Sequence, residues 1–285
     1  MRYYRVGDRF LATDGSATWE LSKADPSVRT FEELAKAAVL GDRHLDDLAE
    51  QYCTEHSRLA SQAPPEDPSL PLVPDEVWAA GVTYRISEEA REAESSLPDV
   101  YRRVYDADRP ELFLKATPSR TVGPNEPVGI RGDSTWDVPE PELGIVLCRD
   151  RIVGYTIGND MSSRSIEGAN PLYLPQAKIY ERSCSLGPCV ASTRTVSSPR
   201  SLELRMAIDR EGTTVYEEAT STAELVRTPE ELVSYLTRHN TPPDQSVLLT
   251  GTGLVPPDEM TLQAGDLVRI ELEEVGTLVN QVIEV

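Results

Sequence analysis

A run of apolar residues that opens on Glu140 and Glu142 constrains the fold of this chain more than any other segment. The two glutamates are two residues apart, so in a strand both carboxylates project from the same face. A second apolar segment, residues 152–157, leads to Asp160, and the charged break at residues 148–151 indicates a hairpin turn. Pairing of the two segments would bring Asp160 back towards the glutamates. The sequence therefore predicts a hairpin that gathers three carboxylates.

Three carboxylates in one pocket repel one another unless a divalent cation neutralises them, and an all-oxygen set favours Mg²⁺, Mn²⁺ or Ca²⁺ over Zn²⁺. An ordinary solvated strand face is the alternative, because 48 of the 285 residues are acidic and Glu92/Glu94 and Glu271/Glu273 repeat the same spacing. The setting favours a site, because Pro141 between the glutamates limits ladder pairing at that point.

Further motifs accompany this hairpin in a fixed order. They are Pro139–Val146, Gly154–Arg164, Lys178 followed by Ser185–Pro188, Leu249–Gly253, Ala264–Asp266 and Gly276–Asn280. Over about residues 75–285, these motifs resemble the fumarylacetoacetate hydrolase superfamily. The resemblance implies a β-rich α+β fold with a mixed β-roll catalytic domain. It also implies a catalytic divalent cation, usually Mg²⁺ with Mn²⁺ as the alternative, bound by Glu140, Glu142 and Asp160.

Three segments, Trp78–Tyr84, Arg109–Thr117 and Ser162–Lys178, resemble the 2-keto-3-deoxy-pentonate dehydratases of that superfamily. Its hydrolases carry a His and a Glu shortly after the position of Tyr84, and these activate water. Residues 85–91 here contain no histidine, and the histidines of the chain, at positions 44, 56 and 239, all lie outside the matched motifs. Water activation by a His/Glu dyad is therefore not expected.

The resemblance implies Mg²⁺-dependent dehydration of a 2-keto-3-deoxy-pentonate, derived from D-xylonate or arabinonate, to 2,5-dioxopentanoate in oxidative pentose degradation. We expect Lys178 to act as the base or a proton shuttle and Glu111 as the acid/base partner for the departing hydroxyl. The substrate carboxylate is expected at Thr252, Gly251 and Gly253, with Arg85 and Arg164 as weaker candidates. For Glu111 the alternative is an ordinary strand-edge acid, and for Arg164 a structural salt bridge.

Two other functions stay open at this point. An acylpyruvate hydrolase or oxaloacetate decarboxylase of the same superfamily is the nearer one, and the missing histidine argues against it. A non-catalytic protein that binds divalent cations is the other, and it gives no use for Lys178 beside the carboxylates. The sequence does not separate the xylonate-derived from the arabinonate-derived substrate, because the two differ at one hydroxyl stereocentre.

The charge of the chain excludes some partners. Its formal net charge is -20, and 24 of its 28 cationic residues are Arg. Such a surface disfavours nucleic acid and anionic membranes, which need clustered positive charge. It favours a salt-rich cytoplasm, where self-repulsion is screened, although an acidic pI that keeps the protein soluble is the alternative. Without a long apolar run or a signal-peptide core, we expect a cytoplasmic enzyme, and the resemblance implies a homo-oligomer, either dimer or tetramer.

Lysine is rare, occurring only at positions 23, 36, 115 and 178, and two of these lie in the matched motifs. Residues 110–115 are expected to form a strand that brings Glu111 and Lys115 to the same region. The segment of residues 162–180 lacks a period and carries Gly168, Pro171 and Pro175, so it is expected to be a long functional loop. The charged segment of residues 87–95 is expected to be an exposed helix or part of a lid.

The N-terminal part has a different pattern of predicted secondary structure from the rest of the chain. Residues 1–70 are expected to form a small α+β accessory domain of short strands followed by helix, with a capping box at Thr30–Glu33. A proline-rich linker at residues 61–71 separates it from a catalytic domain of residues 71–285. The four cysteines match no zinc spacing and are expected to be free thiols.

Overall fold

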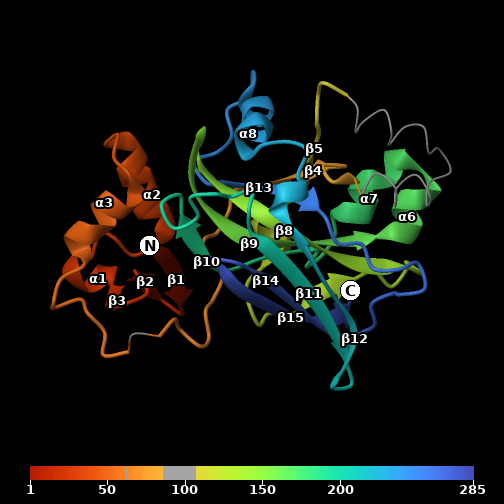
Figure 1. Cartoon of the computed structure of the whole chain (residues 1–285), viewed down its shortest axis with the longest axis horizontal. Helices are drawn as coiled ribbons and strands as arrows, with labels where there is room; N and C mark the ends of the chain where they lie inside the picture. The colour runs from red at the N-terminus through yellow and green to blue at the C-terminus, as the bar shows by residue number, and fades with distance from the viewer. Residues whose placement is uncertain (62, 86–106) are drawn as a thin grey trace.

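A computed structural model describes residues 1–61, 63–85 and 107–285 of the chain (Figure 1). The helix or lid predicted over residues 87–95 lies outside this part. The strands are β1 (Arg2–Val6), β2 (Arg9–Thr13), β3 (Thr18–Glu20), β4 (Glu76–Gly81), β5 (Glu111–Ala116), β6 (Thr121–Val122), β7 (Val128–Ile130), β8 (Asp137–Cys148), β9 (Arg151–Ser163), β10 (Cys184–Ser192), β11 (Glu203–Arg210), β12 (Thr213–Ser221), β13 (Ser246–Thr252), β14 (Leu267–Leu272) and β15 (Gly276–Glu284). The α-helices are α1 (Leu21–Ala24), α2 (Phe31–Leu40), α3 (Leu45–Ala49), α6 (Arg164–Ala169), α7 (Leu174–Lys178) and α8 (Pro229–Thr237).

Two sheets carry the fold. The larger one has the order β3-β2-β1-β10-β9-β8-β13-β4-β5, with β6 added to β10, and the smaller one has the order β12-β11-β14-β15-β7. Most neighbours are antiparallel, but β13 runs parallel to β4, β6 to β10 and β7 to β15. The prediction of a β-rich α+β fold with mixed sheets is confirmed.

The predicted hairpin is the centre of the larger sheet. It consists of β8 and β9, which pair from Asp137 opposite Ser163 to Cys148 opposite Arg151. Every residue of β8 is buried, which agrees with its apolar run. The connecting turn contains Arg149 at a φ of 60°, a left-handed conformation that closes the tight reversal.

The core lies mainly between the two sheets. Leu143, Ile145 and Ile157 of the larger sheet belong to one buried cluster with Met206 and Ile270 of the smaller sheet. A second cluster lies on the other face of the larger sheet, where the side chains of α2 cover it. Close packing between the sheets holds the middle of β8 and β9 in place. The ends of these strands that carry the carboxylates are therefore held in place as well.

The N-terminal strands continue the larger sheet, because β1 pairs with β10. Phe10 and Phe31 from this segment share a buried cluster with Val146 and Leu249 of the later chain. Figure 1 shows α1, α2 and α3 beside β1 to β3 at one end of the molecule, whereas α6 and α7 lie at the opposite end. A domain boundary at residue 70 stays a prediction.

The capping box at the start of α2 is confirmed, since the Thr30 side chain accepts from the amide of Glu33 and the Glu33 side chain accepts from the amide of Thr30. Cys53, Cys148, Cys184 and Cys189 are free thiols, as expected. Among the described residues, no helix has the length and apolar character needed to cross a membrane.

The prediction of a helix-free loop over residues 162–180 was wrong, because this segment contains α6, a 3₁₀ turn and α7. Ser163 caps α6 by accepting from the amide of Ile166, and Asn170 caps the 3₁₀ turn by accepting from the amide of Leu172. Pro171 and Pro175 occupy first-turn positions, where a missing N–H costs nothing. These helices are too short to show a hydrophobic period, so their capping residues were the available signal.

Candidate active site

Three carboxylates converge at one end of the β8–β9 hairpin. Glu140 pairs across the ladder with Asp160, and Glu142 lies two residues further along β8 on the same face. One oxygen of each carboxylate lies within 4.8 Å of the others. All three side chains are buried, with Glu142 and Asp160 each only 1% exposed.

The surroundings of Glu142 disfavour its ionised form. Burial raises the pKa of Glu142 well above its usual range, and the negative charges of Asp160 and Glu140 raise it further. The amide of Gly251 donates to Oε2 of Glu142 at 2.6 Å and orients it. A hard divalent cation would remove the repulsion, and three carboxylate oxygens form a donor set that Mg²⁺ accepts. The residues present therefore fit a magnesium site.

The ammonium group of Lys178, the last residue of α7, lies against this cluster. Its Nζ donates to Oε2 of Glu140 at 2.6 Å, to Oδ2 of Asp160 at 3.2 Å and to Oγ of Ser162 at 2.6 Å. The side chain is buried, and the ring of Phe113 lies 6.0 Å from Nζ. The lysine expected to act in catalysis thus touches two of the three expected metal ligands.

Arg164, at the start of α6, pairs with the other oxygen of Glu140. Its Nη1 lies 3.0 Å from Oε1 of Glu140, and its guanidinium stacks 5.7 Å from the ring of Trp136. The side chain is 2% exposed. These contacts match the structural salt bridge that the sequence left as the alternative for Arg164.

One face of β5 presents Glu111, Phe113 and Lys115 in alternation. Glu111 and Phe113 line the same cavity as the carboxylate cluster. Glu111 pairs across the ladder with Gly81 of β4, and a Cβ atom at Gly81 would come within 2.8 Å of Cδ of Glu111. Glycine at position 81 therefore leaves the room in which the Glu111 carboxyl lies.

The cavity lies at the end of the hairpin, and its space is about 380 Å³ including the part that is open to solvent. Its lining residues are Ala80, Val82, Glu111, Phe113, Glu140, Glu142, Asp160, Glu167, Leu174, Lys178, Gly251 and Thr252. Seven predicted site residues line this cavity: the five charged ones on β5, β8, β9 and α7, together with Gly251 and Thr252. Arg164 is not among the lining residues, but it contacts Glu140. Gly253 and Arg85 are not among the lining residues, and a Cβ atom at Gly253 would meet the ring of Tyr84 at 2.7 Å.

Sequence reasoning missed Glu167, which is buried on α6 and lines the cavity. The sequence offered little reason to select Glu167, because the chain contains 48 acidic residues and only the position of α6 brings this one to the cavity. Lys115 was noticed for its rarity but was not assigned a role. Its Nζ lies 2.7 Å from Oδ1 of Asp160.

The charges of this site nearly balance around a divalent ion. The carboxylates are Glu111, Glu140, Glu142, Asp160 and Glu167, and the cations are Lys115, Arg164 and Lys178. Fully ionised, five acids and three bases leave two negative charges, the amount that one divalent cation neutralises.

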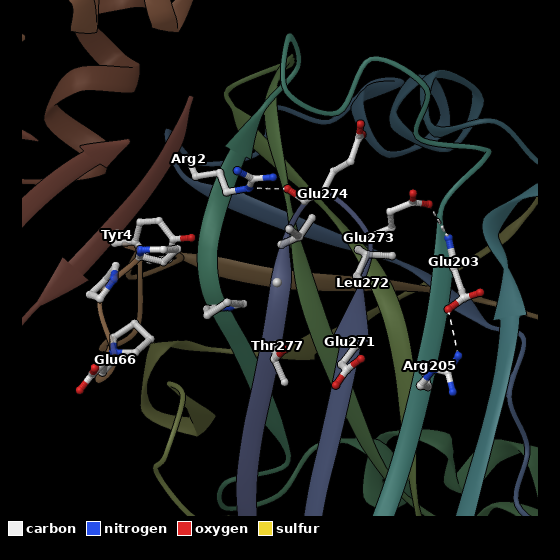
Figure 2. Close-up of a pocket in the computed structure, with 16 residues that line it drawn as sticks. Arg2, Tyr4, Glu66, Glu203, Arg205, Glu271, Leu272, Glu273, Glu274 and Thr277 are labelled. Atoms are coloured by element: carbon white, nitrogen blue, oxygen red, sulfur yellow. Dashed lines mark hydrogen bonds and ion pairs between the residues drawn. The ribbon is translucent and has the colours of Figure 1, made fainter. Parts of the chain in front are cut away.

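A wider hollow of about 1530 Å³ lies away from this site, between β1, residues 64–68 and the β14–β15 turn. Figure 2 shows that several of its charged side chains have partners within the protein. Nε of Arg2 donates to the carbonyl of Glu274 at 2.7 Å, and Arg205 pairs with Glu203 at 3.2 Å. The hollow is not a candidate metal site, because among the described residues the side chains spaced to hold a metal ion are Glu140, Glu142 and Asp160.

Known proteins are similar to this chain in both sequence and fold. The family description "Fumarylacetoacetate (FAA) hydrolase C-terminal" matches residues 76–283. The chain is 54% identical over 289 residues to the "Probable 2-keto-3-deoxyxylonate dehydratase" of Haloferax volcanii, with 100% of both chains covered. It is 42% identical to the "2-dehydro-3-deoxy-D-arabinonate dehydratase" of Saccharolobus solfataricus, over 74% of this chain and 73% of that one.

A solved structure of "2-keto-3-deoxy-D-arabinonate dehydratase complexed with magnesium and 2,5-dioxopentanoate" has a TM-score of 0.84 and 32% sequence identity to this chain. The similarity covers 100% of this chain and 99% of that one.

Proposed function

The chain belongs to the fumarylacetoacetate hydrolase family, and from this premise we propose that it is a lyase that dehydrates a 2-keto-3-deoxy-pentonate to 2,5-dioxopentanoate. The substrate derives from D-xylonate or arabinonate. The observation that carries the proposal is the buried cluster of Glu140, Glu142 and Asp160 in contact with Lys178, in a chain whose relatives over its full length include dehydratases of this class.

Magnesium is the cofactor of this reaction, held by Glu140, Glu142 and Asp160. When bound, it supplies Lewis-acid chemistry to the carboxylate and keto oxygens of the substrate and makes the C3 protons more acidic. Mn²⁺ has similar ligand preferences and is expected to substitute for it.

Lys178 removes a proton from C3 of the substrate. Its Nζ lies at the wall of the cavity beside Glu140 and Asp160, next to the place where the keto group would be held. To accept a proton the amine must be neutral, and a divalent cation bound by Glu140 and Asp160 would offset the negative charge that otherwise favours the ammonium form of Lys178. Ser162, 2.6 Å from Nζ, fixes the direction of the amine.

Glu111 gives a proton to the C4 hydroxyl as it leaves. When the C4–O bond breaks, water departs and a C3–C4 double bond forms. The double bond then moves to C4–C5 as C5 loses a proton and C3 gains one. Protonation at C4, with loss of the proton on the C5 hydroxyl, converts the resulting enol into the C5 aldehyde. Glu111 lines the same cavity as Lys178 but comes from a different strand, β5, so the two groups are able to act on different atoms.

The substrate carboxylate is held by Thr252 and the amides around Gly251 and Gly253. Support for this comes from Gly251 and Thr252, which line the cavity at the end of β13, the strand that pairs with β8. Gly251 has a φ of 87°, and a Cβ atom there would collide with Thr83, so glycine allows the turn to keep this shape beside the cavity. Arg164 and Arg85 are weaker candidates for the same task, and the contact of Arg164 with Glu140 favours a positioning role for it.

No step of this dehydration needs an activated water molecule. Hydrolysis of an acylpyruvate does need one, and the chain has histidines only at positions 44, 56 and 239. None of them is among the residues that line the described cavity. The lack of a histidine among the described lining residues favours the dehydratase over the hydrolase.

The experiment that tests this function is an aldehyde assay on purified protein with Mg²⁺ and each 2-keto-3-deoxy-pentonate. An acylpyruvate and oxaloacetate are tested in parallel. Formation of 2,5-dioxopentanoate that stops on addition of EDTA is expected, and the rates rank the stereoisomers. Release of pyruvate from the acylpyruvate or oxaloacetate, with the sugar acids unchanged, would contradict the proposal.

The cellular setting is part of the proposal. A net charge of -20 with few lysines suits a salt-rich cytoplasm, and the relative from Haloferax volcanii supports this. We expect activity and stability to rise with KCl up to molar concentrations. The protein is expected to be a dimer or tetramer, which light scattering at high salt would test.

A further inference from the structure

We propose that Lys115 is a positioning residue that sets the affinity of the site for Mg²⁺ and links the metal ligand Asp160 to the main chain of Lys178. The role concerns the metal site of the proposed function and rests on it. Lys115 lies on β5, below Phe113, and is 0% exposed. It reaches neither the cavity nor the surface, so its contacts are all with the protein.

The ammonium group of Lys115 is surrounded by acceptors from two elements of the site. It lies 2.7 Å from Oδ1 of Asp160 and donates to the carbonyl of Met161 at 2.9 Å. It also donates to the carbonyl oxygen of Lys178. Asp160 and Met161 belong to β9, whereas Lys178 ends α7, so one side chain ties the two together.

These contacts determine which oxygen of Asp160 faces the metal. Lys115 engages Oδ1, and this leaves Oδ2 beside Nζ of Lys178, which also contacts Glu140. Partners that hold a ligand in this manner fix its orientation, and their removal typically weakens metal binding about 10- to 100-fold. A lysine is suited to this task, because its three N–H donors match the three acceptors.

The same contacts act on Lys178. Its main-chain carbonyl lies at the C-terminal end of α7, where helix carbonyls lack a partner in the helix. By donating to this carbonyl, Lys115 anchors the residue whose side chain contacts Glu140 and Asp160. Loss of Lys115 should therefore change the placement of both a metal ligand and the proposed base.

A purely structural role is the competing explanation, because any buried cation that loses its carboxylate partner destabilises a fold. The test compares Lys115→Met with Arg210→Met. Arg210 pairs at 2.7 Å with Asp266, another buried carboxylate, but lies outside the cavity. Both variants remove a cation from a buried acid, and only Lys115→Met removes it from a proposed metal ligand.

The measurement is calorimetric titration of the metal-free protein with MgCl₂, without substrate, together with thermal unfolding. Lys115→Met is expected to raise the Kd for Mg²⁺ about tenfold or more, and Arg210→Met to lower the Tm while leaving this Kd unchanged. A Kd for Lys115→Met within about twofold of the original protein would overturn the proposal. Because no substrate is present, this result is independent of which reaction the enzyme catalyses; absence of dehydration with normal Mg²⁺ binding would instead contradict the proposed function.

A double-mutant cycle shows whether Lys115 acts through Asp160. If it does, Lys115→Met should weaken Mg²⁺ binding far less in an Asp160→Asn background than in the original protein. If Lys115→Met does not fold, Lys115→Arg takes its place. Arginine keeps the charge but its planar guanidinium does not reproduce the three contacts of the ammonium, so about tenfold weaker Mg²⁺ binding is again expected and unchanged binding would overturn the role.

Discussion

Glu140 and Asp160 face each other on one rung of the β8–β9 ladder, although 19 residues separate them along the chain. Because cross-strand partners on one face lie close together, the hairpin alone determines that these carboxylates meet. Glu142 follows on the same face and completes the group. The strand pairing thus creates an electrostatic problem that Lys115, Arg164, Lys178 and a divalent cation resolve.

Replacing Glu142 by Gln should abolish activity without unfolding the protein. The change removes one expected ligand charge from a buried site, so we expect Mg²⁺ binding and kcat to fall about 100-fold or more. The matched control is Glu271→Gln, which alters the exposed first acid of another Glu-x-Glu pair, on β14. Activity that survives in Glu142→Gln with metal still bound would contradict the assignment of this ligand.

Much of the hairpin was predictable, because the two apolar runs, the charged turn and the Glu-Pro-Glu start are all local signals. The expected strand at residues 110–115 is likewise present as β5. The pairing of β1 with β10 was not predictable, since no local pattern tells which distant strand a short edge segment joins. The same holds for Glu167, whose position depends on the start of a six-residue helix, α6.

Lys178→Met should remove the proposed base. We expect kcat for dehydration to fall about 10²- to 10⁴-fold, with a smaller change in KM, because the residue acts on the reacting proton. Exchange of the C3 protons of the substrate with D₂O, followed by ¹H NMR, should be lost as well. Lys36→Met, which alters an exposed lysine paired with Asp244, is the control and should retain both activities. C3 exchange at the original rate in Lys178→Met would assign the base elsewhere.

Glu111→Gln should separate the two halves of the reaction. Removal of the C3 proton does not need an acid for the leaving hydroxyl, so exchange at C3 should continue while dehydration falls about 10²-fold or more. The measurement is the ratio of the C3 exchange rate to the rate of aldehyde formation in D₂O with Mg²⁺. Loss of exchange together with dehydration would mean that Glu111 takes part in proton abstraction or in substrate binding.

Gly251→Ala should weaken both the fold and the site. Gly251 has a φ of 87°, and a Cβ atom there would meet the carbonyl oxygen of Ala80 at 2.9 Å and also the side chain of Thr83. Backbone strain of this kind costs about 1–3 kcal/mol, and the shift should disturb the amide that donates to Glu142. The matched control is Gly212→Ala, where φ is 78° but no atom lies within 4 Å of the added Cβ.

Urea unfolding and Mg²⁺ titration distinguish the two glycine variants. Gly212→Ala should lose stability through strain alone and keep its affinity for Mg²⁺. Gly251→Ala should lose more stability and bind Mg²⁺ more weakly. Equal effects of the two substitutions on Mg²⁺ binding would show that the turn at Gly251 does not support the site.

Stability should fall with rising pH through the titration of Asp137, the first residue of β8. The side chain is 3% exposed, and burial raises its pKa from 3.8 to about 6. An acid whose pKa is higher in the folded state binds more protons when folded, so the free energy of unfolding decreases as the pH rises between these two values. Above about pH 6 both states are ionised, and the penalty stays constant.

Asp137→Asn removes this titration. The stability of the variant relative to the original protein should therefore increase from pH 4 to about pH 6 and then level off, as measured by urea unfolding at fixed ionic strength. The control is Asp133→Asn, because Asp133 is exposed and its pair with Arg131 lowers its pKa, so it does not titrate in this range. A difference between Asp137→Asn and the original protein that does not change with pH would show that Asp137 ionises in the folded protein as it does in the unfolded chain.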